Sequence, residues 1–384
     1  MHFKARDCRR YPYCGVAVAV ALFAQARASA TSFPEIEPNE SKAAATVANG
    51  LIDGDALTGV STGASTITPG TASADFFRIT LAARPLAIYR HRLMITTTGA
   101  AGHAGTLRGL DQTDLGIGTT DTQIQVSNAG TSPARMNQWY GFGKGESVYY
   151  RVGGLPTTTG VYASTLSTDV VTPTPVGGTL SAGQITITTI GQGHTTDTEL
   201  WVYDSNLNAL PDFGNDDESA AGGGPGLNLL QSILRRTYAP GVYYLAVSDY
   251  NLCNNLVSPP DDQSPRDGPV MDFPNLLVAR QNTPTTNIVS FTISDSAGHS
   301  YPTPAIRPGP YEAAWFTFTV SAPGCNCRGD LSGDNAISTA DVGPFTAALL
   351  NGTPDNCADV DQDGAEDGRD VQPFVRAVIA GTCP

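Results

Sequence analysis

The stretch Ile95-Thr96-Thr97-Thr98-Gly99 and its near copy Ile187-Thr188-Thr189-Ile190-Gly191 decide the fold of this 384-residue chain. Three further pairs of similar motifs follow in the same order: 107–111 with 200–204, 119–121 with 215–217, and 148–150 with 242–244. The offsets, between 92 and 96 residues, indicate an internal duplication. Each block is rich in β-branched or aromatic residues and is bounded by turn residues, as short strands are. The sequence therefore predicts a mainly β protein with two tandem antiparallel β-sandwich domains of a jelly-roll-like kind.

The composition supports this fold class and limits the partners. Charged residues make up 15% of the chain, which also holds 41 Gly and 27 Pro. Soluble proteins are typically about 25% charged, so the chain is short of the Lys and Glu that helical proteins use. Its net charge of −14 repels nucleic acid and anionic membranes but suits divalent cations.

Residues 1–30 are predicted to be a secretory signal peptide. Basic residues between Lys4 and Arg10 precede an apolar run over 15–24, and Ala28-Ser29-Ala30 supplies the small residues of a cleavage site. We place cleavage after Ala30. The apolar run is about half of the ~20 residues that cross a bilayer, so we expect no membrane span. The mature protein should be secreted, either extracellular or at the cell surface.

Breaker residues set the expected domain boundaries. Residues 172–178 are rich in Pro and Gly and are typical of an extended linker, and the Pro- and Asp-rich 258–274 is typical of an exposed loop. After residue 322 the composition shifts toward Asp and Cys. The predicted domains are the sandwiches, 31–168 and 169–321, and a small α-helical module, 322–384.

The C-terminal module carries two twelve-residue loops with the spacing of EF-hand calcium sites. Side-chain oxygens at positions 1, 3, 5, 9 and 12 face a cation in such loops, and position 7 offers its carbonyl. In the first loop these positions hold Asp330, Ser332, Asp334, Ser338, Asp341 and, at position 7, Ala336. In the second loop they hold Asp359, Asp361, Asp363, Asp367, Asp370 and, at position 7, Ala365. We expect Ca²⁺ in both, with the second loop tighter because it carries more carboxylates.

Position 6 of each loop must allow a sharp turn, and Asn335 and Gly364 stand there. Each loop leads into a predicted short apolar helix, over 342–350 and 371–379. Two such units 29 residues apart, each with Asp at position 12 and one following helix, resemble a type I dockerin. Glu366 departs from that family, because its loop position 8 is normally apolar.

The dockerin resemblance implies Ca²⁺-dependent docking on a cohesin or another surface protein. In that family, recognition uses the helices and loop positions 10 and 11, which here are Thr339, Ala340, Gly368 and Arg369. Apolar helix residues are candidates for the same surface, although they could equally pack the core of the module. These residues are Phe345, Leu349, Phe374 and Val378.

The two sandwiches resemble the bacterial pre-peptidase C-terminal domain. In the first copy the resemblance rests on Glu35-Ile36-Glu37-Pro38-Asn39-Glu40 and on Asp75 before an aromatic strand. In the second copy it rests on 197–204, 215–217 and 241–244. The resemblance implies non-catalytic β-sandwiches appended to a secreted protein. Four acidic residues of the second copy could form a further Ca²⁺ site or could cap turns instead: Asp197, Asp204, Asp216 and Asp217.

The cysteines agree with export, since disulfides persist in oxidising compartments. After removal of the signal, Cys253, Cys325, Cys327, Cys357 and Cys383 remain. Because the ends of a duplicated loop–helix unit lie close together, we expect Cys383 to pair with Cys325 or Cys327, and Cys253 is left odd. A zinc site is the alternative, but the module contains no His.

No motif predicts catalysis. Gly59-Val60-Ser61-Thr62-Gly63 matches a nucleophile-elbow string but lacks a strand before it and a helix after it. We therefore expect a non-enzymatic protein, with a secreted hydrolase of the glycosidase type as one alternative, because two carboxylates suffice for that chemistry. The other alternative is a polysaccharide-binding protein. Its candidate stacking platforms are Trp139, Trp201, Tyr243 and Trp315.

Overall fold

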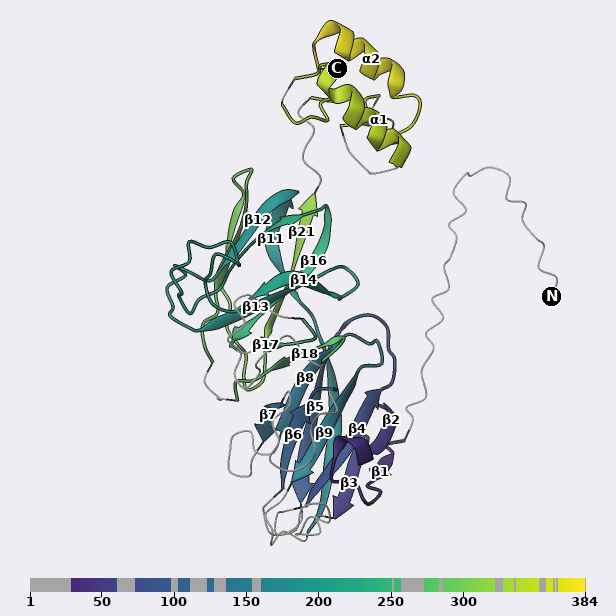
Figure 1. Cartoon of the computed structure of the whole chain (residues 1–384), viewed down its shortest axis with the longest axis vertical. Coiled ribbons are helices and arrows are strands. Elements are labelled where there is room, and N and C mark those ends of the chain that lie inside the picture. Colours follow the sequence, from purple (N-terminus) through teal and green to yellow (C-terminus); the bar gives the residue numbers. More distant parts are fainter. Residues whose placement is uncertain are drawn as a thin grey trace, which may run out of the picture.

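A computed structural model describes residues 29–60, 73–97, 103–110, 123–127, 136–153, 160–250, 252–256, 273–282, 286–321, 327–334, 336–351, 357–361, 363 and 365–383. Within these ranges the chain is mainly β, as predicted, with four sheets and two short α-helices, α1 (Val342–Asn351) and α2 (Val371–Ala380) (Figure 1). The predicted signal peptide lies outside the described residues, apart from its last two. In the described part of the chain, no helix has the length and apolar character needed to cross a membrane.

The first sandwich is built from ten strands of the described chain. They are β1 (Ser32–Pro34), β2 (Thr46–Leu51), β3 (Ala56–Val60), β4 (Ala74–Leu81), β5 (Ile88–Thr97), β6 (Ala104–Arg108), β7 (Gln123–Ser127), β8 (Met136–Gly141), β9 (Ser147–Gly153) and β10 (Val161–Val171). One sheet has the order β2-β4-β9-β6-β7, and the facing sheet contains β1-β3-β10-β5-β8. Side chains alternate in burial, as the period-two pattern requires: in β10, Tyr162 and Leu166 are buried and Val161 is exposed. Their buried faces form one hydrophobic core.

The second sandwich repeats this plan with a sheet of order β11-β21-β16-β13-β14 facing one of order β15-β12-β19-β20. The strands are β11 (Thr174–Ser181), β12 (Gly183–Thr188), β13 (Thr198–Tyr203), β14 (Ala209–Asn215), β15 (Ile233–Tyr238), β16 (Gly241–Asp249), β19 (Phe291–Asp295), β20 (Ser300–Thr303) and β21 (Ala314–Ser321). Its core is separate from the first, and alternate residues such as Ile185 and Ile187 of β12 point into it.

The interpretation of residues 172–178 as a linker was wrong for most of that stretch. Residues 174–178 form the first part of β11, which pairs in parallel with β21. Pro175 and the Gly pair are tolerated because β11 lies at the edge of its sheet and the register shifts between Pro175 and Thr179. Edge strands and bulges accept residues that would break a central ladder.

The two sandwiches share one sheet plan but not one chain order. Six consecutive strands, β5 to β10, occupy the same sheet positions as β12, β13, β14, β15, β16 and β19. The remaining pair, β3 and β4, corresponds to β20 and β21, which come at the end of the second unit instead of before its core strands. In both units an edge strand pairs in parallel, β2 with β4 and β11 with β21. The second unit is therefore a strand permutation of the first, a relation that motif spacing could not reveal.

A segment of the second half of the chain completes the first sandwich. Strands β17 (Leu252–Cys253) and β18 (Leu276–Ala279) extend its larger sheet, because β18 pairs with β8. Residues 258–272 of the predicted loop lie outside the described residues. Phe273, at the end of that predicted exposed loop, is buried in the first core, so this part of the prediction was wrong. The apolar ring of Phe273 is buried because it packs against the core of the first sandwich.

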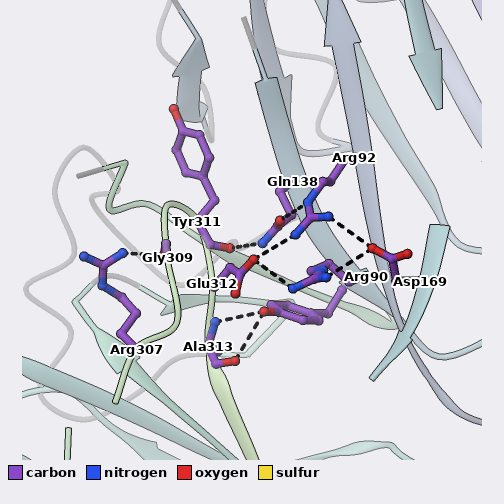
Figure 2. A network of polar contacts seen from close by, with 10 residues as sticks. Arg90, Arg92, Gln138, Asp169, Arg307, Gly309, Tyr311, Glu312 and Ala313 are labelled. Carbon is purple, nitrogen blue, oxygen red and sulfur yellow. Dashed lines mark hydrogen bonds and ion pairs between the residues drawn. The ribbon is translucent and has the colours of Figure 1, made fainter. Parts of the chain in front are cut away.

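A third core joins the two sandwiches, and five of its twelve buried residues are aromatic. Tyr140 and Phe142 of the first unit contact Trp315 of the second, with ring centroids 5.5 and 5.9 Å apart. Beside it, Figure 2 shows Glu312 between two guanidinium groups, with Arg90 Nη1 and Arg92 Nη2 each 2.8 Å from its Oε1. Both arginines also contact Asp169, at 3.1 Å. Buried rings and these ion pairs hold the sandwiches against each other.

Candidate metal centre

The position-12 aspartates clamp both C-terminal loops in the same way. Oδ1 of Asp341 accepts hydrogen bonds from the backbone N–H groups of Leu331 and Ser332, at 3.0 and 2.8 Å, and Oδ2 accepts one from Ser338, at 2.8 Å. Asp341 has no exposed surface. Burial alone would raise the pKa of this carboxyl, but the backbone donors outweigh it and lower the pKa. The ionised side chain therefore closes the loop onto itself.

Asp370 repeats this clamp in the second loop. Its Oδ1 accepts hydrogen bonds from the N–H groups of Val360 and Asp361, at 2.7 and 3.0 Å, and its Oδ2 accepts one from Asp367, at 2.9 Å. The donors are again loop positions 2, 3 and 9. In the first loop a capping box adds to the clamp: Ser338 Oγ accepts from the backbone N–H of Asp341, while the Asp341 side chain accepts from the Ser338 N–H. Ser338 Oγ also accepts from Ala340 N–H, at 3.0 Å. Two loops 29 residues apart thus share one backbone design.

The inward carboxylates of the second loop converge. Asp359, Asp361 and Asp363 each offer an oxygen, and these three oxygens lie within 4.8 Å of one another. Such a set of hard oxygen ligands fits Ca²⁺. Two guanidinium groups partly neutralise the cluster: Arg369 Nη1 lies 2.8 Å from Asp363 Oδ2, and Arg328 Nη1 lies 3.7 Å from Asp359 Oδ2. The hydrogen bond from Arg369 is the main cause of the lowered pKa of Asp363.

The first loop also has hydrogen bonds within it. Asp330 Oδ1 accepts bonds from Ser332 Oγ, Gly333 N–H and Asp334 N–H, at 3.2, 2.7 and 3.2 Å. Asp334 Oδ1 accepts one from Ala336 N–H at 2.9 Å, and Asp363 does the same for Ala365. Asn335 and Gly364, the position-6 residues, lie outside the described residues. The donor types at the predicted ligand positions fit a hard cation in both loops, with fewer carboxylates in the first.

The two helices confirm the predicted spans to within a residue and pack on each other through aromatic rings. Phe345 and Phe374 are buried, and their rings stack with centroids 3.8 Å apart. They belong to a small core with Ile337 from loop position 8. Glu366, at position 8 of the second loop, is half-buried and lies outside this core. Phe345 and Phe374 therefore serve the module's interior, and Leu349 and Val378 are only partly buried against it.

An apolar groove runs between the helices beside these rings. It has a volume of about 300 Å³ and is lined by Val342, Thr346, Leu349, Leu350, Val371 and Val375 together with the two phenylalanines. Leu350 is 80% exposed, and Val371 and Val375 are more than 40% exposed. Exposed apolar side chains gathered on a small module are typical of a contact surface for another protein.

A disulfide between Cys327 and Cys383 joins the two ends of the module, which confirms one of the two predicted pairings. The other candidate, Cys325, lies outside the described residues. Cys357 is disulfide-bonded as well. Cys253 is a buried thiol in the core of the first sandwich. Closing the module's ends restricts its unfolded chain, as a small domain with a thin core requires.

Acidic residues also gather in the second sandwich. Oxygens of Asp197, Asp216 and Asp217 lie within 4.8 Å of one another, and Asp216 is buried. Asp204 is not part of this group. Its Oδ1 accepts hydrogen bonds from the N–H groups of Asn206 and Asn208, at 2.9 and 2.8 Å, so Asp204 caps a turn. The structure therefore brings three of the four predicted aspartates together.

Sequence reasoning did not select a third acidic group, in the first sandwich. Oxygens of Glu35, Glu37 and Asp75 lie within 4.8 Å of one another, and Asp75 is 1% exposed. Burial, with the nearby charge of Glu35, raises the pKa of Asp75 well above its ordinary value. The alternation of Glu35 and Glu37 is a weak signal in the sequence, but their meeting with Asp75 depends on the packing of an N-terminal segment beside β4.

The predicted stacking platforms for polysaccharide are not at the surface. Trp139, Trp201 and Trp315 are at most 4% exposed and lie in hydrophobic cores. Tyr243 is half-buried and stacks on Phe318, with ring centroids 5.4 Å apart. The aromatic side chains therefore stabilise the fold. No family model matches the chain, and no curated protein matches it significantly.

Proposed function

We propose that this chain is an exported, non-catalytic protein whose C-terminal module binds Ca²⁺ and docks on a partner protein, so that the paired β-sandwiches are displayed at a surface. One observation carries the proposal: two loops with EF-hand spacing have the same position-12 clamp, and the second gathers three carboxylates. Each loop opens directly into a helix, which couples ion binding to the position of that helix.

The groove between α1 and α2 supports the docking part of the proposal. Its exposed side chains, Leu350, Val371 and Val375, are apolar, and the helices that carry them are held by the two loops. A partner with a complementary apolar face would bury these side chains. By its resemblance to a type I dockerin, the module would take a cohesin-like surface protein as this partner.

The test is a binding assay between the full mature chain and a panel of cohesin domains. We expect binding in millimolar Ca²⁺ that is lost when a chelator is added. Leu350→Asp and Val375→Asp should abolish it, because each places a charge in the groove. Ala347→Asp is the matched control, since Ala347 is exposed on the same helix but outside the groove lining. Calcium-independent binding, or equal binding by all three variants, would contradict the proposal.

A further inference from the structure

A cavity of about 190 Å³ opens where the two sandwiches meet. It is assembled from four segments: the end of β8, the β13–β14 turn, the residues after β17 and the residues before β18. Its polar and aromatic lining consists of Phe142, Tyr203, Asn208, Asn254, Asn255 and Asn275. Four of these six side chains are amides. The cavity exists only because β17 and β18 are donated across the junction.

The floor of the cavity holds two buried polar atoms with spare hydrogen-bonding capacity. Asn254 is 1% exposed, and its Oδ1 accepts a hydrogen bond from Leu256 N–H at 2.7 Å. Its Nδ2 faces the hydroxyl of Tyr203, which is also 1% exposed, and neither atom has a further partner among the described residues, so one amide N–H and the phenol O–H stay available to a ligand. Burial raises the pKa of Tyr203, so the phenol keeps its proton. Buried donors that lack a full set of partners are unfavourable unless something else satisfies them.

The rim is polar and carries no net charge. Asn208, Asn255 and Asn275 are exposed there. The Asn208 side chain lies between opposite charges, because Lys144 Nζ donates to its Oδ1 at 2.7 Å and its Nδ2 donates to Asp204 Oδ2 at 2.9 Å. Phe142, which is buried, adds an apolar face. This environment favours a neutral ligand that both donates and accepts hydrogen bonds.

We propose that the cavity binds one residue of a neutral hexose, free or at the end of a glycan. Amides and a phenol match the alternating donors and acceptors of sugar hydroxyls, and an aromatic face matches the apolar side of a pyranose ring. Drug-sized ligands occupy roughly 300–1,000 Å³, so this cavity suits a smaller molecule. It exceeds the share of about 30 Å³ that one water molecule occupies. The proposal goes beyond the docking function, and it uses none of the aromatic platforms considered from the sequence.

The test measures binding of four sugars to the full mature chain by saturation-transfer NMR and by titration: D-glucose, D-galactose, D-mannose and N-acetyl-D-glucosamine. In a second arm, the free sugar is replaced by a soluble glycan that ends in the tested sugar. Tyr203→Phe removes only the hydroxyl and should weaken binding roughly five- to tenfold, the contribution of one hydrogen bond. Tyr238→Phe is the matched control. Tyr238 is 2% exposed and its hydroxyl has no partner among the described residues, but it lies in the second core and outside the cavity lining.

The expected result is saturable binding of at least one hexose by the wild type and by Tyr238→Phe, with Tyr203→Phe weakened and its thermal unfolding unchanged or raised. If only the glycan binds, the cavity recognises the terminal sugar of a glycan and not the free sugar. Failure of all four hexoses and of the glycan would overturn the proposal, as would equal weakening by the two Phe variants. None of these outcomes depends on the C-terminal module, so they are distinct from a failure of docking.

Discussion

The two loops of the C-terminal module have the same backbone clamp but different side chains at the predicted ligand positions. Asp341 and Asp370 receive the same three backbone hydrogen bonds at the same loop positions. The inward residues of loop 2 are three converging carboxylates with Arg369 and Arg328 beside them, whereas position 3 of loop 1 is Ser332. The comparison suggests two roles that can be tested: position 12 holds the loop shape through backbone hydrogen bonds, and the number of carboxylates at positions 1, 3 and 5 ranks the expected ion affinity.

Removal of the clamp should have the largest effect. We expect Asp341→Ala and Asp370→Ala each to destabilise their loop by about 2–4 kcal/mol, because each deletes three hydrogen bonds to a charged, buried acceptor. Hydrogen exchange with mass spectrometry on the full chain, in chelator, should show lost protection in 327–351 for the first variant and in 357–383 for the second. Asp334→Ala, which deletes one exposed bond, is the control. Equal loss of protection in all three variants would show that position 12 has no special role in the shape of the loops.

Removal of a position-1 carboxylate should affect Ca²⁺ binding and not loop shape. Calorimetry on the full chain should show two sites in the C-terminal module, with the tighter one lost in Asp359→Ala and the weaker one lost in Asp330→Ala. The order follows from ligand charge, because loop 2 has one more carboxylate among positions 1, 3 and 5. Two results would contradict this ranking by ligand charge. The wild type could give no heat of binding at millimolar Ca²⁺, or the variants could lose the two sites in the opposite order.

Acid should loosen loop 1 in a predictable pH window. The pKa of Asp341 is lowered below its ordinary 3.8 in the folded chain. A lowered pKa means that the contribution of this group to stability is present above about pH 4 and is lost as the pH falls through the folded value. Hydrogen exchange of 327–351 should therefore rise below pH 4 in the wild type. Asp341→Asn, which does not ionise, should show a flatter profile; an unchanged profile would mean that another group controls the loop.

The smallest expected effect concerns the guanidinium of loop 2. Arg369 is 73% exposed and pairs with Asp363 at 2.8 Å, so it would compete with a cation for that carboxylate. Arg369→Ala should tighten Ca²⁺ binding at loop 2 by about two- to fivefold, the range expected of an exposed ion pair. Arg376→Ala removes the same charge from an exposed site on α2 and serves as control. Weaker binding in Arg369→Ala than in Arg376→Ala would reverse this interpretation.

Features encoded in short stretches of sequence were predictable. Periodicity and breaker residues predict the spans of α1 and α2 and the β-strands that contain 107, 148, 200 and 242. The closeness of the ends of a repeated unit predicts that Cys383 pairs with Cys325 or Cys327, and the structure shows that the partner is Cys327. The same local logic led to the wrong linker at 172–178, because a strand at a sheet edge accepts the residues that a linker uses.

The sequence by itself determined the β class, the twelve-residue loops and the helices that follow them, since each depends on residues within a few positions of one another. Tertiary structure alone decided the permuted strand order, the donation of β18 to β8, and the burial of Trp139, Trp201 and Trp315. It also decided the meeting of Arg90 with Glu312, which are 222 residues apart, and the asparagine-lined cavity at the junction. Contacts between distant segments leave no periodic trace in a sequence, because they depend on which apolar faces pack together once all the strands have formed.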